Sequence, residues 1–134
     1  MKRISVLIIF SMLLFFASCK NKEESKEIDQ IEVLAPQKFH DATAGNQVQL
    51  LDVRTNKEFE EGHLESAVNI DVLEDDFAEK AKTLDKSQPV YLYCRSGNRS
   101  QKAAATLKDM GFEKIYDMEG GYLLWSSEGL KTQK

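Results

Sequence analysis

One cysteine lies in a sequence that suits nucleophilic chemistry. Cys94 follows an apolar segment, residues 89–93, that is typical of a strand. It precedes a segment in which Ala103, Leu107 and Met110 recur at helical spacing. We therefore expect the thiol in a tight loop between the end of a strand and the start of a helix. Backbone N–H groups and the helix dipole concentrate positive potential at such a point, which favours a thiolate and holds an anion beside it.

The loop that follows the thiol is polar and carries two cations. It comprises Arg95, Ser96, Gly97, Asn98, Arg99 and Ser100. We expect these residues to line an anion site, mainly through their backbone. Each arginine could contact a substrate or remain a solvated surface charge, and Arg99 could instead pair with an acidic residue near the helix N-terminus. This polarity argues against the alternative that Cys94 is an inert core thiol.

The elements that must position this loop alternate between strand and helix, with short connections. The pattern predicts strands over residues 31–34, 48–53, 67–70, 89–93 and 114–118, and helices that start near Pro36, Thr55 and Leu73, after the Cys94 loop and near Tyr122. This order predicts an α/β fold with a central, mostly parallel five-stranded sheet and helices on both faces. Ligand sites of such sheets lie beyond the carboxyl ends of strands, and both Asp52 and Cys94 fall at such ends.

Three other polar residues near these strand ends have structural interpretations. Asp52 is expected to accept hydrogen bonds from neighbouring N–H groups, and Arg54 is expected to form ion pairs at the sheet edge. His63 could pair with a catalytic cysteine, but we favour a hydrogen-bonded residue of the fold. The two histidines and Cys94 have no metal-site spacing, so we predict no metal ion.

The N-terminal region predicts export. Lys2 and Arg3 precede residues 4–17, an apolar stretch of 14 residues. A membrane-spanning helix needs about 20, so this length fits a cleaved signal peptide better. Ala17-Ser18-Cys19 resembles the lipobox of bacterial lipoproteins, although Phe16 stands where that motif prefers leucine. The alternative is an ordinary signal peptide with an incidental cysteine.

This resemblance implies a domain order and a location. Residues 1–18 would be a lipoprotein signal peptide, and residues 19–30 would be the lipidated Cys19 and a charged tether. Residues 31–128 would form one domain, followed by a tail over 129–134. The protein would be anchored by lipid to a membrane of the bacterial cell envelope, most simply at the outer membrane or the periplasmic face. Lipidation of Cys19 would leave Cys94 without a disulfide partner, since the chain has two cysteines.

The charge balance bears on the class of partner. The chain has a formal charge of −4, and loss of Lys2 and Arg3 with the signal peptide would lower it to −6. A net negative domain argues against nucleic acid as a partner.

Several motifs, in the correct order, resemble those of the rhodanese (sulfurtransferase) domain family. They are Leu50–Arg54, Glu58-Phe59, Gly62–Leu64 and Ala67–Ile70 for the first signature, Cys94–Ser100 for the catalytic loop, and Gly120-Gly121 with Trp125 for the C-terminal motif. The resemblance covers residues 31–128. It departs at Glu65-Ser66, where the family usually has Pro-Gly, and we expect this to change a turn and not the chemistry.

The resemblance implies a ping-pong sulfurtransferase with a rhodanese-like fold. Cys94 would take a sulfur atom from thiosulfate, a persulfide or a polysulfide, and pass it to cyanide or to a thiol acceptor. Arg95–Ser100 would bind the anionic donor, and Asp52 and Arg54 would position the loop. No cofactor is implied, because the side chain itself carries the sulfur.

Two other functions remain open on the sequence. The domain could be a binding or regulatory module that presents Cys94 without turnover, or a redox-sensing thiol of the envelope. Phosphate chemistry is disfavoured by loop length. Cysteine phosphatases place an arginine six positions after the cysteine, whereas here Arg99 is five positions after Cys94 and the next residue is Ser100.

Overall fold

A computed structural model describes residues 29–134 of the chain. The predicted signal peptide, Cys19 and most of the predicted tether lie outside the described residues. Between residues 29 and 134, no helix combines the length and the apolar character needed to cross a membrane.

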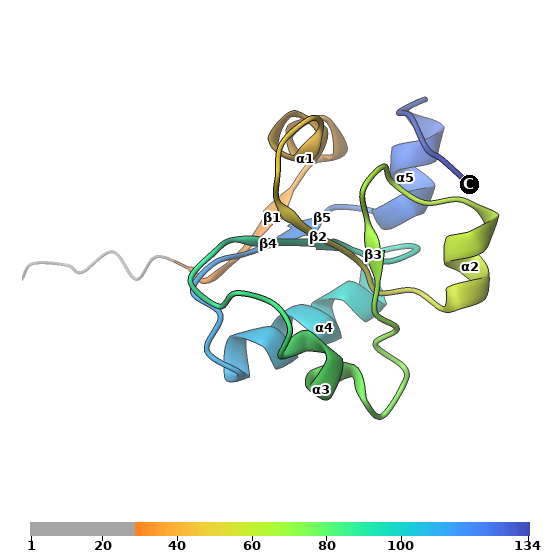
Figure 1. Cartoon of the computed structure of the whole chain (residues 1–134). Coiled ribbons are helices and arrows are strands. Elements are labelled where there is room, and N and C mark those ends of the chain that lie inside the picture. Colours follow the sequence, from red (N-terminus) through yellow and green to blue (C-terminus); the bar gives the residue numbers. More distant parts are fainter. Residues whose placement is uncertain (1–28) are drawn as a thin grey trace, which may run out of the picture.

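The described residues form one five-stranded parallel sheet with helices on both faces (Figure 1). The elements in chain order are β1 (Ile31–Leu34), α1 (Pro36–Thr43), β2 (Gln49–Asp52), α2 (Asn56–Glu61), β3 (Val68–Asn69), α3 (Phe77–Ala81), β4 (Val90–Tyr93), α4 (Asn98–Asp109), β5 (Ile115–Met118) and α5 (Gly121–Ser127). The strand order is β1-β5-β4-β2-β3, and every pair is parallel. The predicted α/β class is confirmed. Because the strands are parallel, their carboxyl ends share one edge, and β4 ends at the centre of it.

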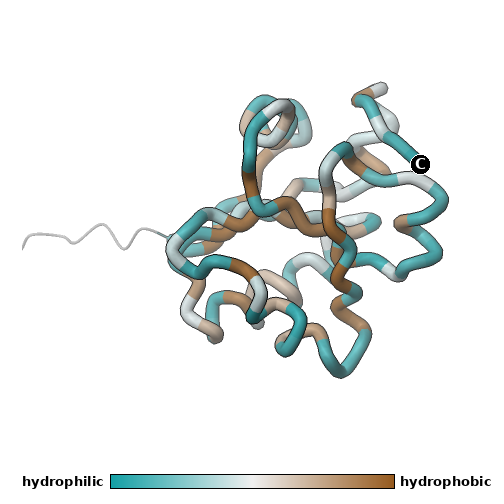
Figure 2. Tube along the Cα trace, in the orientation of Figure 1, coloured by the Kyte–Doolittle hydropathy of each residue, from teal (hydrophilic) through white to brown (hydrophobic). Residues whose placement is uncertain are grey.

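The core has two layers, one on each face of the sheet, as alternation along β4 shows. Val90 and Leu92 are fully buried with α4 on one face, whereas Tyr91 and Tyr93 pack toward α1 and α5 on the other. This is the period of two that a strand imposes on its side chains. Figure 2 shows the apolar residues following the strands between the two helical layers. The three inner strands β2, β4 and β5 are therefore largely buried on both faces, whereas the edge strands β1 and β3 are partly exposed.

One predicted helix is shorter than its sequence pattern. The spacing of Leu73, Phe77 and Ala81 predicts a helix that begins at Leu73, but α3 begins at Phe77, and Leu73 is 57% exposed. The reason is local: the Asp71 carboxylate accepts a hydrogen bond from the Leu73 backbone N–H at 2.9 Å. Such a turn competes with helix formation over the residues that follow it.

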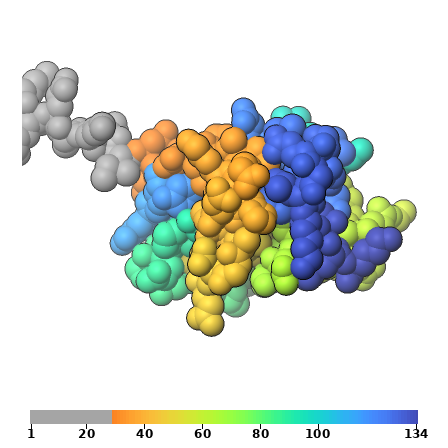
Figure 3. Space-filling model, turned by 90° about the horizontal axis from the view of Figure 1, so that it is seen from above, coloured from red at the N-terminus to blue at the C-terminus, as the bar shows by residue number. Residues whose placement is uncertain are grey.

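The C-terminal segment after α5 packs onto the domain. Gln133 and His63 exchange backbone hydrogen bonds of 2.8 and 2.9 Å in an isolated antiparallel bridge. The Trp125 indole N–H donates to the Lys131 carbonyl oxygen at 3.1 Å. Figure 3 shows α1 and α5 side by side on this face of the molecule, with the last residues running beside α5. Residues 129–134, expected as a tail, thus contact the loop that follows α2.

Candidate active site

The Cys94 thiol lies at the centre of the carboxyl edge of the sheet, directly after β4. Its sulfur accepts a hydrogen bond from the Gly97 backbone N–H at 3.0 Å and lies 3.4 Å from the Ser100 hydroxyl oxygen. The residue is only 1% exposed. Gly97 has a φ of +103°, a conformation that disfavours a side chain, and it turns the chain from the strand into α4. The predicted strand–loop–helix setting of the thiol is therefore the observed one.

The N-terminus of α5 holds the carbonyl groups of this loop. The Tyr122 N–H donates to the Cys94 carbonyl oxygen at 2.8 Å, and the Leu123 N–H donates to the Arg95 carbonyl oxygen at 3.0 Å. These bonds require close approach at Gly121, where a Cβ atom would lie 2.5 Å from the Cys94 carbonyl oxygen. The carbonyl groups of Cys94 and Arg95 are therefore bound to α5, and the Gly97 N–H donates to the sulfur. The second glycine of the Gly-Gly pair is thus part of the site.

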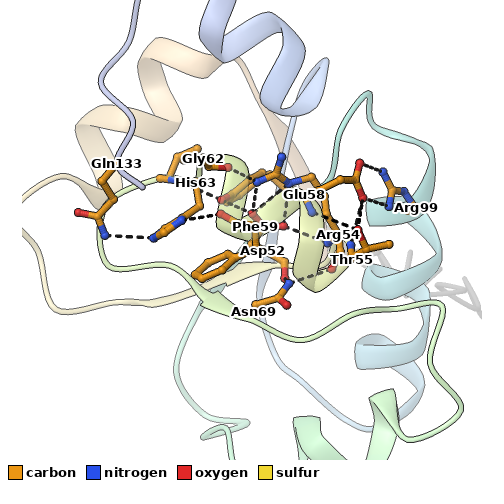
Figure 4. Close-up of polar contacts among 12 residues, drawn as sticks. Asp52, Arg54, Thr55, Glu58, Phe59, Gly62, His63, Asn69, Arg99 and Gln133 are labelled. Carbon is orange, nitrogen blue, oxygen red and sulfur yellow. Dashed lines mark hydrogen bonds and ion pairs between the residues drawn. The ribbon is translucent and has the colours of Figure 1, made fainter.

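Arg99 is held by an acidic partner. Its Nη1 and Nη2 atoms donate to the two oxygens of Glu58 at 2.7 and 2.8 Å (Figure 4). Thr55 donates to the same carboxylate from its N–H and its hydroxyl. Its hydroxyl oxygen also accepts from the Glu58 N–H at 3.2 Å, and the two reciprocal bonds that involve the backbone N–H groups form the capping box that starts α2. The hydrogen bonds from Arg99 are the main cause that lowers the pKa of Glu58 to about 2. Of the roles left open for Arg99, the structure places it in an ion pair that joins α2 to α4.

Arg95 has a different position. It is exposed, and it forms none of the ion pairs found among residues 29–134. It borders a shallow pocket of about 280 Å³ beside the loop, with Arg54, Tyr122 and Leu123 among the other lining residues. Ser96 and Asn98 are exposed on the same loop. Arg95 is therefore the loop cation that an incoming anion can reach.

Asp52 and Arg54 form a buried pair behind the loop. Asp52 is fully buried, and the Arg54 Nε atom donates to its two oxygens at 2.9 and 3.0 Å. The Tyr93 hydroxyl donates to the same carboxylate at 2.6 Å, and Arg54 also donates to the Gly62 carbonyl oxygen at 2.6 Å. Burial raises the pKa of Tyr93 well above its usual range. Because Tyr93 directly precedes Cys94, this network fixes the end of β4.

His63 is part of the fold and does not contact Cys94. Its Nδ1 atom lies 2.8 Å from the Phe59 carbonyl oxygen, its ring stacks on Phe59 at 3.7 Å, and its Nε2 atom lies 3.3 Å from the Gln133 amide (Figure 4). Among residues 29–134, no three histidine, cysteine or acidic side chains come together as a metal site.

Sequence reasoning missed three supports of the site. The sequence patterns predict no role in the site for Tyr93, Glu58 or Tyr122, although all three hold the loop or the end of β4. The one available signal was the Thr55–Glu58 capping box, which fixes the Glu58 side chain at the start of α2. Nothing in the local sequence links Glu58 to Arg99.

The fold and the loop define a class: an open parallel α/β domain with a cysteine in the loop between the central strand and a helix. A family model for the rhodanese-like domain matches residues 35–128, and the chain belongs to this family. The rhodanese part of the sequence resemblance is thereby confirmed.

Relatives and solved structures agree with this assignment. Protein YqhL of Bacillus subtilis is 32% identical over the full length of both chains. A tRNA uridine(34) hydroxylase of Cytophaga hutchinsonii is 39% identical over 71% of this chain, which spans only 31% of that protein. A rhodanese-related protein from Thermoplasma volcanium superposes with a TM-score of 0.67 at 27% identity, over 76% of this chain and 97% of that one.

Proposed function

We propose that this protein is a sulfurtransferase in which Cys94 carries the sulfur as a persulfide. The Cys94 thiolate attacks the outer sulfur of thiosulfate, the S–S bond of the donor breaks, and sulfite leaves with the bonding electron pair. The enzyme then holds an anionic Cys94–S–S⁻ group. A thiol acceptor, or cyanide, attacks the outer sulfur of this group and releases the Cys94 thiolate.

The observation that carries the proposal is the arrangement of the loop around the sulfur. The Gly97 N–H points at Sγ, while α5 holds two loop carbonyls through Tyr122 and Leu123. N–H groups that are fixed before the reaction stabilise an anion without reorganisation, and both the thiolate and the persulfide are anions. The exposed Arg95 adds a positive charge where a dianionic donor would approach.

Phosphate transfer is the less favoured use of the same loop. Phosphate enzymes with a cysteine nucleophile need an arginine that faces the phosphate. Here Arg99 donates both terminal nitrogens to Glu58, and position 100 is a buried serine. The loop thus presents one N–H donor to the Cys94 sulfur and no arginine placed to face a phosphate.

The direct test is a mass measurement on protein that carries Cys19→Ala, in which Cys94 is the only thiol. Thiosulfate should add the mass of one sulfur atom, and cyanide should remove it. An unmodified mass with Cys94 still open to alkylation would contradict sulfur transfer and favour the binding module. Sulfenic acid or a mixed disulfide without added sulfur would favour the redox sensor.

Replacing Arg95 by alanine should weaken donor binding. We expect KM for thiosulfate to rise about tenfold with a smaller change in kcat, since an exposed charge that steers a dianion contributes mainly to binding. Lys102→Ala on the exposed side of α4 is the matched control, because it removes one positive charge outside the loop. Steady-state kinetics at low and high salt would measure the effect. Equal KM values for the two variants would rule out the proposed role of Arg95.

The natural acceptor is proposed to be a small thiol or a protein thiol. The tRNA hydroxylases are about three times as long as the matched region, so their activity does not transfer with it. A formal charge of −4 gives the chain no electrostatic basis for binding nucleic acid.

We also propose that Cys19 anchors the protein to a membrane of the bacterial cell envelope. The support is the sequence Ala17-Ser18-Cys19 after an apolar stretch. Cys19→Ala should move the protein from the membrane fraction to the soluble fraction, measured by fractionation and immunoblotting. Cys94→Ala is the control, because it removes the other cysteine and should leave the distribution unchanged. Membrane retention of the Cys19→Ala protein would refute the anchor.

A further inference from the structure

A second cavity lies apart from the Cys94 loop, on the face of the sheet that α1 and α5 cover. It has a volume of about 330 Å³ and is lined by the C-terminal end of α1, by residues 64–66 and by residues of α5 and the segment after it. Figure 3 shows α1 and the last residues of the chain on this face. None of residues 94–100 lines the cavity. Its volume is at the small end of the range in which proteins bind small molecules, so a ligand of this cavity is small.

The floor of the cavity is apolar. It is formed by Leu50, Leu64 and Trp125, which line the cavity and are almost wholly buried. The polar groups beside them are already bonded. The Trp125 indole N–H donates to the Lys131 carbonyl oxygen at 3.1 Å, and the Thr43 hydroxyl donates to a backbone carbonyl of α1 at 2.9 Å. The floor therefore offers an incoming molecule mainly apolar contact, and polar recognition is left to the rim.

Two opposite charges lie at the rim. The Lys131 Nζ atom is 3.7 Å from a Glu65 carboxylate oxygen, and both side chains are largely exposed. An exposed ion pair at this distance contributes little to stability. Neither residue forms another ion pair among residues 29–134, and His40, the third titratable lining residue, faces Asp41. Glu65 and Lys131 can therefore each bind a group of opposite charge at little cost to the fold.

A strained turn holds Glu65 at this rim. The Ala67 N–H donates to the Leu64 carbonyl oxygen at 3.1 Å, which closes a turn with Glu65 and Ser66 at its centre. Ser66 has a φ of +67° and is the one non-glycine residue of the described chain with a positive φ. Turns of this kind favour glycine at that position. Both central residues line the cavity, and backbone strain of this kind is typical of sites that fix a ligand-binding group.

We propose that this cavity binds a small zwitterion with an apolar side chain, of the class of the free aliphatic amino acids. The ammonium group of the ligand lies against the Glu65 carboxylate, and its carboxylate lies against the Lys131 ammonium group. The apolar side chain enters the cavity and packs on Leu50, Leu64 and Trp125. Charges of opposite sign then alternate around a ring of four, so every neighbouring pair attracts. A ligand with a single charge meets one attractive and one repulsive group at the rim.

The test is a titration of Cys19→Ala protein with leucine, followed by tryptophan fluorescence. The chain has one tryptophan, Trp125, so its emission reports on this cavity. Leucine should change the emission in a saturable way. Isopentylamine has the same side chain without the carboxylate, and isocaproate has it without the ammonium group. Each should bind about tenfold more weakly than leucine, because one charge-assisted contact is lost and one repulsive contact remains.

Two variants assign the charges to their residues. Lys131→Ala should weaken leucine binding about tenfold and should bind isopentylamine no more weakly than the wild type, because isopentylamine has no carboxylate. Glu65→Gln should weaken leucine binding to a similar extent and should bind isocaproate no more weakly. Lys82→Ala is the matched control. It removes the lysine of another exposed ion pair, with Glu79, at the end of α3, and it should leave all three affinities unchanged.

Saturation-transfer NMR on the same three compounds measures binding without relying on a change in fluorescence. Leucine that gives neither a fluorescence change nor saturation transfer at millimolar concentration would overturn the proposal. Equal affinities for leucine and its two analogues would also overturn it, because binding would then depend on the apolar side chain alone. The titration uses no sulfur donor and the cavity is not lined by Cys94, so its result is independent of whether thiosulfate modifies that residue.

Discussion

Replacing Cys94 with serine is expected to abolish persulfide formation and to lower sulfur transfer by at least about 10³-fold. Serine is the sharpest substitution here because its hydroxyl is close in size to the thiol and can still accept the Gly97 N–H. The loss would therefore reflect nucleophilicity and not packing. A neutral hydroxyl attacks sulfur poorly, and no histidine of residues 29–134 is placed to activate it: His63 is bound to the Phe59 carbonyl oxygen, and His40 contacts Asp41 and Trp125.

The measurement is steady-state transfer from thiosulfate to cyanide, together with the intact mass after exposure to the donor. Thermal unfolding of both proteins is the control, and the midpoints should agree within a few degrees. Turnover within tenfold of the wild type, in a folded serine variant, would show that Cys94 is not the sulfur carrier.

The second large effect is expected from Gly121→Ala. An added Cβ would lie 2.5 Å from the Cys94 carbonyl oxygen and 2.7 Å from the Arg95 carbonyl oxygen, and the residue has a φ of +60°. The loop or the start of α5 would have to move, which would lengthen the bonds from Tyr122 and Leu123 that hold the loop carbonyls. Backbone strain and two weakened hydrogen bonds together should lower the free energy of unfolding by about 3 kcal/mol. Persulfide formation should slow more than tenfold, because the Gly97 N–H would no longer be held against the sulfur.

Gly129→Ala is the matched control for this substitution. Gly129 has a φ of +72°, so alanine meets the same backbone strain, but nothing lies within 4 Å of its Cβ position. It should cost about 1 kcal/mol and leave the rate of persulfide formation unchanged. Urea unfolding and rapid-mixing kinetics would compare the two variants. Equal changes in the free energy of unfolding and in the rate of persulfide formation for the two variants would contradict the role assigned to the contact between α5 and the loop.

Local features of the site were predictable from the sequence. Cys94 and its loop follow from a strand, a polar turn and a helical pattern that are adjacent along the chain, and the capping box at Thr55 depends on two residues three apart. The sheet followed from the alternation of elements, because parallel strands need crossover helices. These predictions required no knowledge of which segments meet in space.

Contacts between distant segments were not predictable in the same way. Glu58 and Arg99 are 41 positions apart, as are Asp52 and Tyr93, and each pair forms only after the strand order is set. Asp117 on β5 is only 3% exposed, and no local signal predicts this, since a single acidic residue in a short strand is usually solvent-exposed. Its burial depends on α4 covering β5, which the chain order alone does not show. The helical pattern of Leu73, Phe77 and Ala81 extends further toward the N-terminus than α3 does, because Asp71 accepts a hydrogen bond from the Leu73 N–H and forms a turn there.

The ion pair between Glu58 and Arg99 separates two tasks within one loop. The Arg99 guanidinium stabilises the fold through Glu58, whereas the Arg95 guanidinium is exposed and can meet a ligand. Substitution of Arg95 can therefore change which ligand the shallow pocket prefers without disturbing Arg54, Glu58 and Tyr122, the pocket residues that hold the loop in place. The same separation makes Arg95 the residue with which to begin if the ligand specificity of this domain is to be redesigned.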